Sequence, residues 1–203
     1  MAFDPFGKFM ASQSSEDKNL IIWRVQNFKN IIKEHVHESY YKQSTTMSLF
    51  RRLSWSSDGT FISTTAGKIG NQYLAPLIQR STWDLLATLS GHSKSITVTR
   101  INPKLFKVPN QDKEYDYATG QEKPNLACYS VVALASIDST ISIWKPYMQK
   151  PLAVILDIFK MGITDMSWAF NGNILLACSH DGVIMSIHFK PGVLGEPVSE
   201  FEK

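Results

Sequence analysis

The sequence repeats one short pattern four times, and this repeat constrains the fold more than any other feature. An alternating apolar strand runs into a turn rich in Pro, Asp, Asn or Gly in MAFDPFG, LSWSSDG, TRINPKL and MSWAFNG, which begin at residues 1, 53, 99 and 166. The equivalent aromatic or Ile positions are 52, 46 and 67 residues apart, the last spacing being lengthened by a polar stretch: Phe3, Trp55, Ile101 and Trp168. A period of about 40 to 50 residues is typical of β-propeller blades.

Further apolar stretches follow each turn. The second stretches are FMASQS, FISTTA, VVALAS and ILLACS, and the third are NLIIWRV, QYLAPLIQR, TISIWKP and VIMSIHF. A fourth is visible twice, as WDLLATL and PLAVILDIF. Because strand follows strand without helical periodicity, the pattern predicts an all-β partial propeller of about three complete blades plus part of a fourth.

These strands divide the chain into units. Residues 1–26 are predicted to hold the second and third strands of an incomplete blade, and residues 27–48 a degenerate fourth strand and a linker, although FKNIIKEHV has some helical spacing. Two blades are expected at 49–90 and 91–159, the last blade at 160–191, and a polar tail at 192–203. The second of these blades carries a polar insertion at 107–125, which we expect to be a mobile loop.

Composition excludes several classes of protein. With 21 basic and 18 acidic residues the net charge is +3, too small to predict nucleic-acid binding from bulk electrostatics. Cys128 and Cys178 stand far apart, without the spacing of a zinc site or a disulfide framework, so a reducing compartment and no metal are expected. No apolar run approaches the roughly 18 to 20 residues of a membrane span, so the expectation is a soluble, intracellular protein.

The densest cluster of polar residues is His92, Ser136, Asp138 and Trp144, within one repeat. In a propeller blade a His before the first strand, a Ser on the second, an Asp in the following turn and a Trp on the third can form a buried hydrogen-bond network that ties the strands together. A serine hydrolase using Ser136, His92 and Asp138 is the alternative, but no nucleophile motif surrounds Ser136. We therefore predict a structural network, with no catalytic residue and no cofactor.

Three other patterns carry no predicted chemistry. GKIG from residue 67 lacks the spacing of a phosphate-binding loop and suggests a hairpin tip. His35 and His37 lie on one face of a possible strand, but without a third ligand a solvated pair is the better interpretation. The basic pair Arg51 and Arg52 suggests a solvated edge.

Several longer segments resemble the propeller of the HIRA family of histone chaperone subunits, in order and over nearly the whole chain. They include ASQSSEDKNLIIWRV, FRRLSWSSDG, GHSKSITVTRINPKLFK, ASIDSTISIWKPYMQKPLAVI and ITDMSWAFNGNILLACSHDGVI. NPKLFK followed by a polar insertion is the most telling part, and FKPGVLGEPVSEFEK resembles the end of that propeller. The WD-repeat subunit of chromatin assembly factor one is a second match, through its similar SWSSDG turn and Leu-Gly-x-Pro ending.

This resemblance implies a nuclear, non-catalytic WD-repeat scaffold in replication-independent nucleosome assembly and transcriptional repression. Its implied partners are an ubinuclein-type subunit and other subunits of the HIR complex, with histones contacted indirectly. Neither a membrane nor a small-molecule substrate is implied. Since the first residues match the middle of the family's seven-bladed ring, the missing propeller half is a further expected partner, and a natural truncation and a partial gene model are both open. The alternatives are the chromatin assembly factor subunit and a WD scaffold of another assembly.

Overall fold

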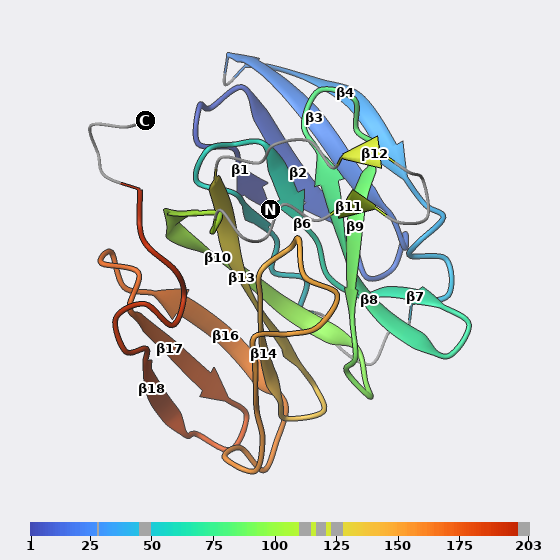
Figure 1. Ribbon diagram of the computed structural model, residues 1–203. Helices are drawn as coiled ribbons and strands as arrows, with labels where there is room; N and C mark the ends of the chain where they lie inside the picture. Colours follow the sequence, from blue (N-terminus) through green and yellow to red (C-terminus); the bar gives the residue numbers. More distant parts are fainter. Residues whose placement is uncertain (28, 45–49, 110–114, 117–120, 123–127, 199–203) are drawn as a thin grey trace.

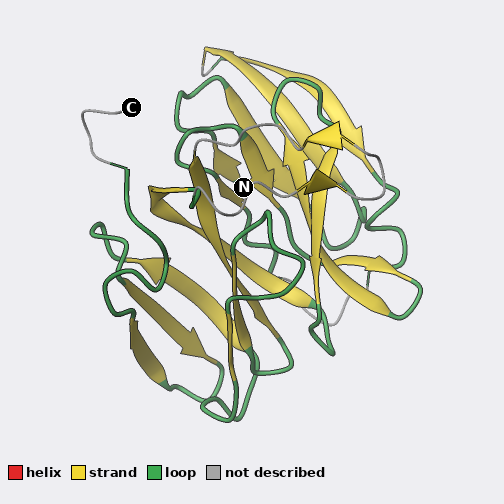
Figure 2. Ribbon diagram, in the orientation of Figure 1, coloured by secondary structure: helices red, strands yellow, loops and turns green. Residues whose placement is uncertain are grey.

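The computed structural model describes residues 1–27, 29–44, 50–109, 115–116, 121–122 and 128–198 (Figure 1). Within these ranges every regular element is a strand (Figure 2). No described helix is long and apolar enough to cross a membrane. The strands form four antiparallel sheets of three to five strands, and a two-stranded ribbon of β11 (Tyr115–Asp116) and β12 (Gln121–Glu122). This all-β architecture of successive small sheets confirms the predicted partial WD-repeat propeller.

The first sheet contains four strands, one more than the second, third and degenerate fourth strands predicted for residues 1–48. Its order is β1 (Ala2–Phe3), β2 (Phe9–Gln13), β3 (Leu20–Asn27) and β4 (Asn30–His37). The prediction of an incomplete blade at residues 1–26 is wrong, because Ala2 and Phe3 pair with Ala11 and Met10 as a first strand. The segment with some helical spacing forms β4, since its residues pair along the edge of β3.

In the second sheet, the second strand is divided into two short strands. It contains β5 (Ser54–Trp55), β6 (Phe61–Ser63), β7 (Gly67–Ile69), β8 (Gln72–Gln79) and β9 (Leu85–Ser90). β6 and β7 pair with opposite ends of β8, so together they occupy the place of one strand. GKIG is therefore mostly strand β7 rather than a hairpin tip, and only Gly70, with φ of 56°, lies in the turn.

The third sheet lies at the centre of the molecule (Figure 1). Its order is β10 (Ile96–Lys107), β13 (Cys128–Ser136), β14 (Ile141–Trp144) and β15 (Ala153–Ile155). The polar insertion falls between β10 and β13. Residues 110–114, 117–120 and 123–127 of the insertion lie outside the described residues, so the predicted mobility of this loop stays a prediction.

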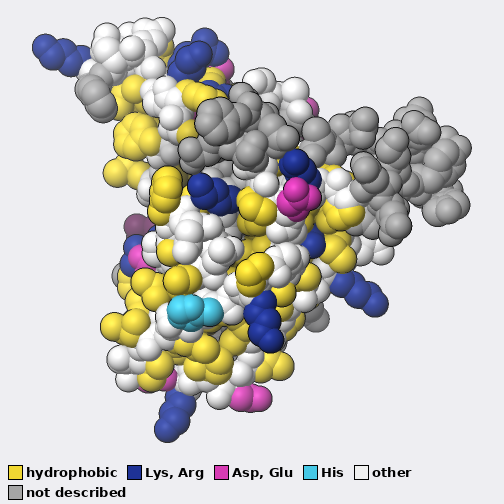
Figure 3. Space-filling model, turned by 60° about the vertical axis from the view of Figure 1, so that its left-hand side comes forward, with side chains coloured by type: hydrophobic (Ala, Val, Ile, Leu, Met, Phe, Trp, Pro, Cys, Tyr) yellow, Lys and Arg dark blue, Asp and Glu magenta, His cyan; other side chains and the backbone are white. Residues whose placement is uncertain are grey.

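The fourth sheet is the incomplete one. It has the order β16 (Ile163–Trp168), β17 (Ile174–Ser179) and β18 (Ile184–His188). Its outer side, at the left of Figure 1, is turned toward the viewer in Figure 3, where hydrophobic side chains gather over the lower part of the face. Ile184 is 78% exposed and Leu176 is 45% exposed on these strands.

Among the described residues, three hydrophobic clusters hold the sheets together, and each lies between two successive sheets. β13 shows why its sequence is apolar at nearly every position. Val132 and Leu134 face the second sheet, whereas Val131 and Ala133 face the fourth. A strand covered on both faces shows no polar alternation, and each fully buried Val or Leu contributes about 1.5 to 3 kcal/mol to stability.

The unusual NPK sequence forms a bulge in β10 instead of the predicted tight turn. Ile101 pairs with Val132 and Leu105 with Ser130, so three residues of β10 oppose one of β13. Pro103 is tolerated because a bulge does not require its missing N–H. The Asn102 side chain accepts a bond from Lys104 N (2.9 Å) and donates to Gly172 O (2.7 Å), which joins the bulge to the fourth sheet.

The described part of the predicted polar tail returns to the third sheet. Leu194 is 2% exposed, Lys107 N donates to Glu196 O (2.8 Å) and Val198 N donates to Leu105 O (2.8 Å). The prediction of a tail is wrong for residues 192–198, because an apolar side chain and two backbone bonds fix them against β10.

Candidate interaction site

The polar cluster of the third blade is a continuous hydrogen-bond network. His92 Nδ1 lies 2.9 Å from Thr140 Oγ1 and 3.3 Å from Asp138 Oδ2, and His92 Nε2 lies 2.8 Å from Ser142 Oγ. Trp144 Nε1 donates to the same Ser142 hydroxyl at 2.8 Å. The network links the segment before β10 to the β13–β14 turn and to β14.

One assignment of the protons satisfies every donor and acceptor of the network. The Trp144 indole can only donate, so the Ser142 oxygen accepts from it and the Ser142 hydroxyl is free to donate to His92 Nε2. Nδ1–H then donates toward Thr140 and Asp138. Every side chain of this network has a hydrogen-bond partner, which is the condition under which a buried polar network stabilises a fold.

The pKa of Asp138 depends on the same network. Burial alone would raise it, but bonds from the His92 and Thr140 side chains and from Ser93 N outweigh burial and hold the pKa well below its usual range. Asp138 is therefore a fixed anion at neutral pH, bonded to Ser93 N at 2.8 Å.

Ser136 does not occupy the predicted place in the network. Its hydroxyl donates to Lys94 O (3.1 Å) and accepts from Asp138 N (3.1 Å), and its side chain makes no described bond to His92. The serine that joins His92 to Trp144 is Ser142, which sequence analysis missed. The spacing in the sequence could have identified it, because Ser142 and Trp144 are two residues apart and therefore share one face of a strand.

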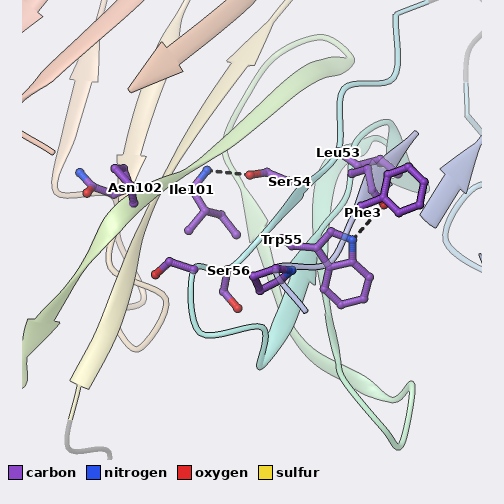
Figure 4. A pocket seen from close by; sticks show the side chains of 11 residues that line it. Phe3, Leu53, Ser54, Trp55, Ser56, Ile101 and Asn102 are labelled. Atoms are coloured by element: carbon purple, nitrogen blue, oxygen red, sulfur yellow. Dashed lines mark hydrogen bonds between the residues drawn. The ribbon is translucent and has the colours of Figure 1, made fainter. Parts of the chain in front are cut away.

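A pocket of about 380 Å³ lies where the first strands of three blades meet (Figure 4). Its walls are mostly apolar, with several small polar residues, and come from β1, β5, β10 and the turns that follow them: Ala2, Phe3, Pro5, Leu53, Ser54, Trp55, Ser56, Ser57, Ile101, Asn102 and Pro103. Ligand pockets in proteins commonly have volumes of about 300 to 1,000 Å³, so this pocket lies near the lower end of that range.

Hydrogen bonds fix the walls of this pocket. Trp55 Nε1 donates to Ala2 O (3.1 Å) and Ile101 N donates to Ser54 Oγ (3.0 Å), as Figure 4 shows. Ser57 Oγ is buried and has no partner among the described residues. The pocket therefore has a mostly apolar wall that hydrogen bonds hold in place, and the Ser57 hydroxyl is buried behind it.

The histidine pair is neither fully solvated nor a metal site in the described part of the chain. The rings of His35 and His37 lie 4.4 Å apart. Burial and, to a lesser extent, the neighbouring His35 lower the pKa of His37 to about 4, against an opposing effect of Asp84. Among the described residues no group of three His, Cys, Asp or Glu could hold a metal ion. Cys128 and Cys178 are free thiols.

The arginine pair is not the solvated edge that its sequence suggested. Arg51 is 7% exposed and donates to Phe50 O (3.1 Å), and burial lowers the pKa of its guanidinium. Arg52 is half-buried and reaches the fourth sheet, where its Nε donates to Thr164 O (2.8 Å). The bond from Arg52 to Thr164 joins residues more than 100 positions apart, so no local sequence pattern reveals it.

Comparisons with known proteins agree with this geometry. Residues 154–186 match the family described as WD domain, G-beta repeat. This match runs from β15 to β18, and so joins the outer strand of one blade to the first three strands of the next.

Similarity to three fungal proteins extends over nearly the whole chain. Protein HIR1 of Cryptococcus neoformans is 33% identical over 94% of the chain, protein HIR1 of Mycosarcoma maydis 30% over 98%, and protein hir1 of Schizosaccharomyces pombe 32% over 100%. The chain spans about a fifth of the length of these relatives, with shares of 20%, 18% and 20%.

Proposed function

This chain is a relative of the HIR1 proteins and forms part of a WD-repeat propeller, and on this premise we propose that it is a non-catalytic scaffold of a histone chaperone complex. Its role is to hold subunits together during replication-independent nucleosome assembly and transcriptional regulation in the nucleus. One observation carries the proposal: the similarity to HIR1 proteins extends over 94% to 100% of the chain and so includes all four blades.

The described polar residues support a scaffold rather than an enzyme. The densest cluster joins strands of one blade, and the Ser136 hydroxyl is bonded to Lys94 O, so it is not poised against His92. A serine-directed fluorophosphonate probe tests this point. We expect no labelling of Ser136, and labelling that disappears in Ser136→Ala would contradict a purely structural role.

The proposed partners are an ubinuclein-type subunit and other HIR complex subunits, with histones contacted through them. The test is affinity purification of the tagged chain from nuclear extract, with bound proteins identified by mass spectrometry. The expected result is recovery of HIR complex subunits together with nuclear fluorescence of the tagged chain. An unrelated WD-repeat chain with the same tag is the control.

The alternatives give different outcomes in this purification. Recovery of the other chromatin assembly factor one subunits instead of HIR complex subunits would favour that factor. Recovery of an unrelated assembly would favour a general WD scaffold. Either result would overturn the proposed complex while leaving the propeller fold intact.

A further inference from the structure

We propose that the surface formed by β5, β10 and β16, the first strands of the second, third and fourth sheets, binds an acidic segment of a partner protein. We call this surface the inner wall. A carboxylate of that segment binds Arg52 and Arg100, and a neighbouring apolar side chain enters the pocket beside them. This inference rests on the proposed function as an interaction module, and it adds the chemistry of the partner.

Two arginines share one carboxylate on this wall. Arg52 Nη1 lies 3.3 Å from Asp165 Oδ2, and Arg100 Nη2 lies 2.6 Å from Asp165 Oδ1. Neither arginine has another ion pair with a described acidic residue. The cluster therefore carries one positive charge more than its single carboxylate balances.

Both guanidinium groups are held in place before any ligand arrives. Arg52 Nε donates to Thr164 O and Arg100 Nε donates to Met166 O, each at 2.8 Å. Arg52 also lies over the Phe50 ring, with its Cζ 5.0 Å from the ring centroid. Because the side chains are already ordered, a ligand loses little affinity to the cost of ordering them.

The arginines retain capacity for a further anion. Within the described part of the chain, Arg52 Nη2 has no hydrogen-bond acceptor. The Arg52 side chain is 36% exposed and that of Arg100 is 25% exposed, so a ligand can reach both. A planar guanidinium fork matches the geometry of a carboxylate, which makes a Glu or Asp side chain a suitable occupant.

The surplus charge is already costly to the free protein. Burial lowers the pKa of Arg100, Asp165 raises it, and the neighbouring Arg52 lowers it. A second carboxylate would offset the repulsion between the two arginines in this partly buried position, where charges are less screened than in bulk water. The same change would stabilise the complex.

The arginine pair and the pocket are adjacent. Arg100 Nη1 donates to Leu53 O at 3.4 Å, and Leu53 lines the pocket. An extended peptide with an acidic residue next to an apolar one satisfies both sites. A nucleic-acid backbone fits less well, because one surplus charge beside an apolar pocket is a poor match for a row of phosphates.

The test is fluorescence anisotropy with the whole chain and a labelled synthetic peptide of alternating glutamate and leucine. The matched probe replaces every glutamate by glutamine. We expect the glutamate peptide to bind about tenfold more tightly. Arg52→Gln should remove most of that difference, Arg52→Lys should retain part of it, and Asp165→Asn, which removes the internal competitor, should strengthen binding of the glutamate peptide.

Lys150→Gln is the charge-matched control, since Lys150 is exposed in the turn after β14, away from the arginine pair, and should leave both affinities unchanged. Circular dichroism checks that each variant is folded. If Arg52→Gln unfolds, the proposal is still tested by the affinities of the unmodified chain for the two peptides and by the Asp165→Asn variant. Equal affinities for the two peptides, weaker binding by Asp165→Asn, or tighter binding of single-stranded DNA would overturn the proposal. If the peptide test fails but the purification still recovers HIR complex subunits, the acidic ligand is refuted and the proposed scaffold function is not.

Discussion

Replacing Ser142 by alanine tests the network of the third blade most directly. Its hydroxyl accepts from Trp144 Nε1 and reaches His92 Nε2, each at 2.8 Å, and all three side chains are buried. The substitution leaves one buried donor and one buried acceptor without partners, and each costs about 1 to 3 kcal/mol. Allowing for partial relaxation, we expect the free energy of unfolding to fall by about 2 to 4 kcal/mol.

Urea denaturation followed by tryptophan fluorescence measures this loss. With a urea dependence of about 2 kcal/mol per M, the midpoint should fall by about 1 to 2 M. Ser93→Ala is the matched control, because Ser93 is exposed, its hydroxyl is 3.4 Å from Asp138, and the stronger Ser93 N bond at 2.8 Å survives. That variant should lose at most about 0.5 kcal/mol.

A double-mutant cycle isolates the bond between Ser142 and the indole. Trp144→Phe removes the Nε1–H donor, so Ser142→Ala should cost less in that background, with a coupling of about 0.5 to 3 kcal/mol. The reasoning would be refuted if Ser142→Ala unfolded at the midpoint of Ser93→Ala, or if the two substitutions were additive.

Three further predictions concern other parts of the molecule. His37 has a pKa of about 4 when folded against about 6.5 when unfolded, so the folded state binds the proton less well and the free energy of unfolding should fall between about pH 6.5 and pH 4. Because the ring is half-exposed we expect a loss of about 1 kcal/mol, which pH-dependent melts should show and His37→Asn should remove. Gly195→Ala places a Cβ 2.2 Å from Tyr129 Oη at φ of 118° and should cost about 2 kcal/mol or more in urea denaturation, whereas Gly192→Ala, with open space around it, should cost about 1. Light scattering of the isolated chain should show self-association through the exposed face of β16–β18, and Ile184→Ser should weaken it, so an unchanged mass distribution in that variant would contradict this role of the face.

The strands can be recognised in the sequence because their periodicity is local. The second and third apolar stretches correspond to β2 and β3, β6 and β8, β13 and β14, and β17 and β18. His92, Asp138 and Trp144 could be grouped because each has a fixed place relative to the strands of one blade. Ser136 was placed wrongly because the choice between it and Ser142 depends on which side chain faces the histidine, a matter of register between strands.

Local sequence patterns specify the succession of strands and turns, since alternation and turn residues act within a few positions of each other. How the blades meet depends on tertiary packing. It paired Arg52 and Arg100 with Asp165, buried Arg51, and brought Phe3, Trp55 and Ile101 to one pocket. The physical reason is that these contacts join residues about 50 to more than 100 positions apart, whose side chains meet only after the sheets have packed around a common axis.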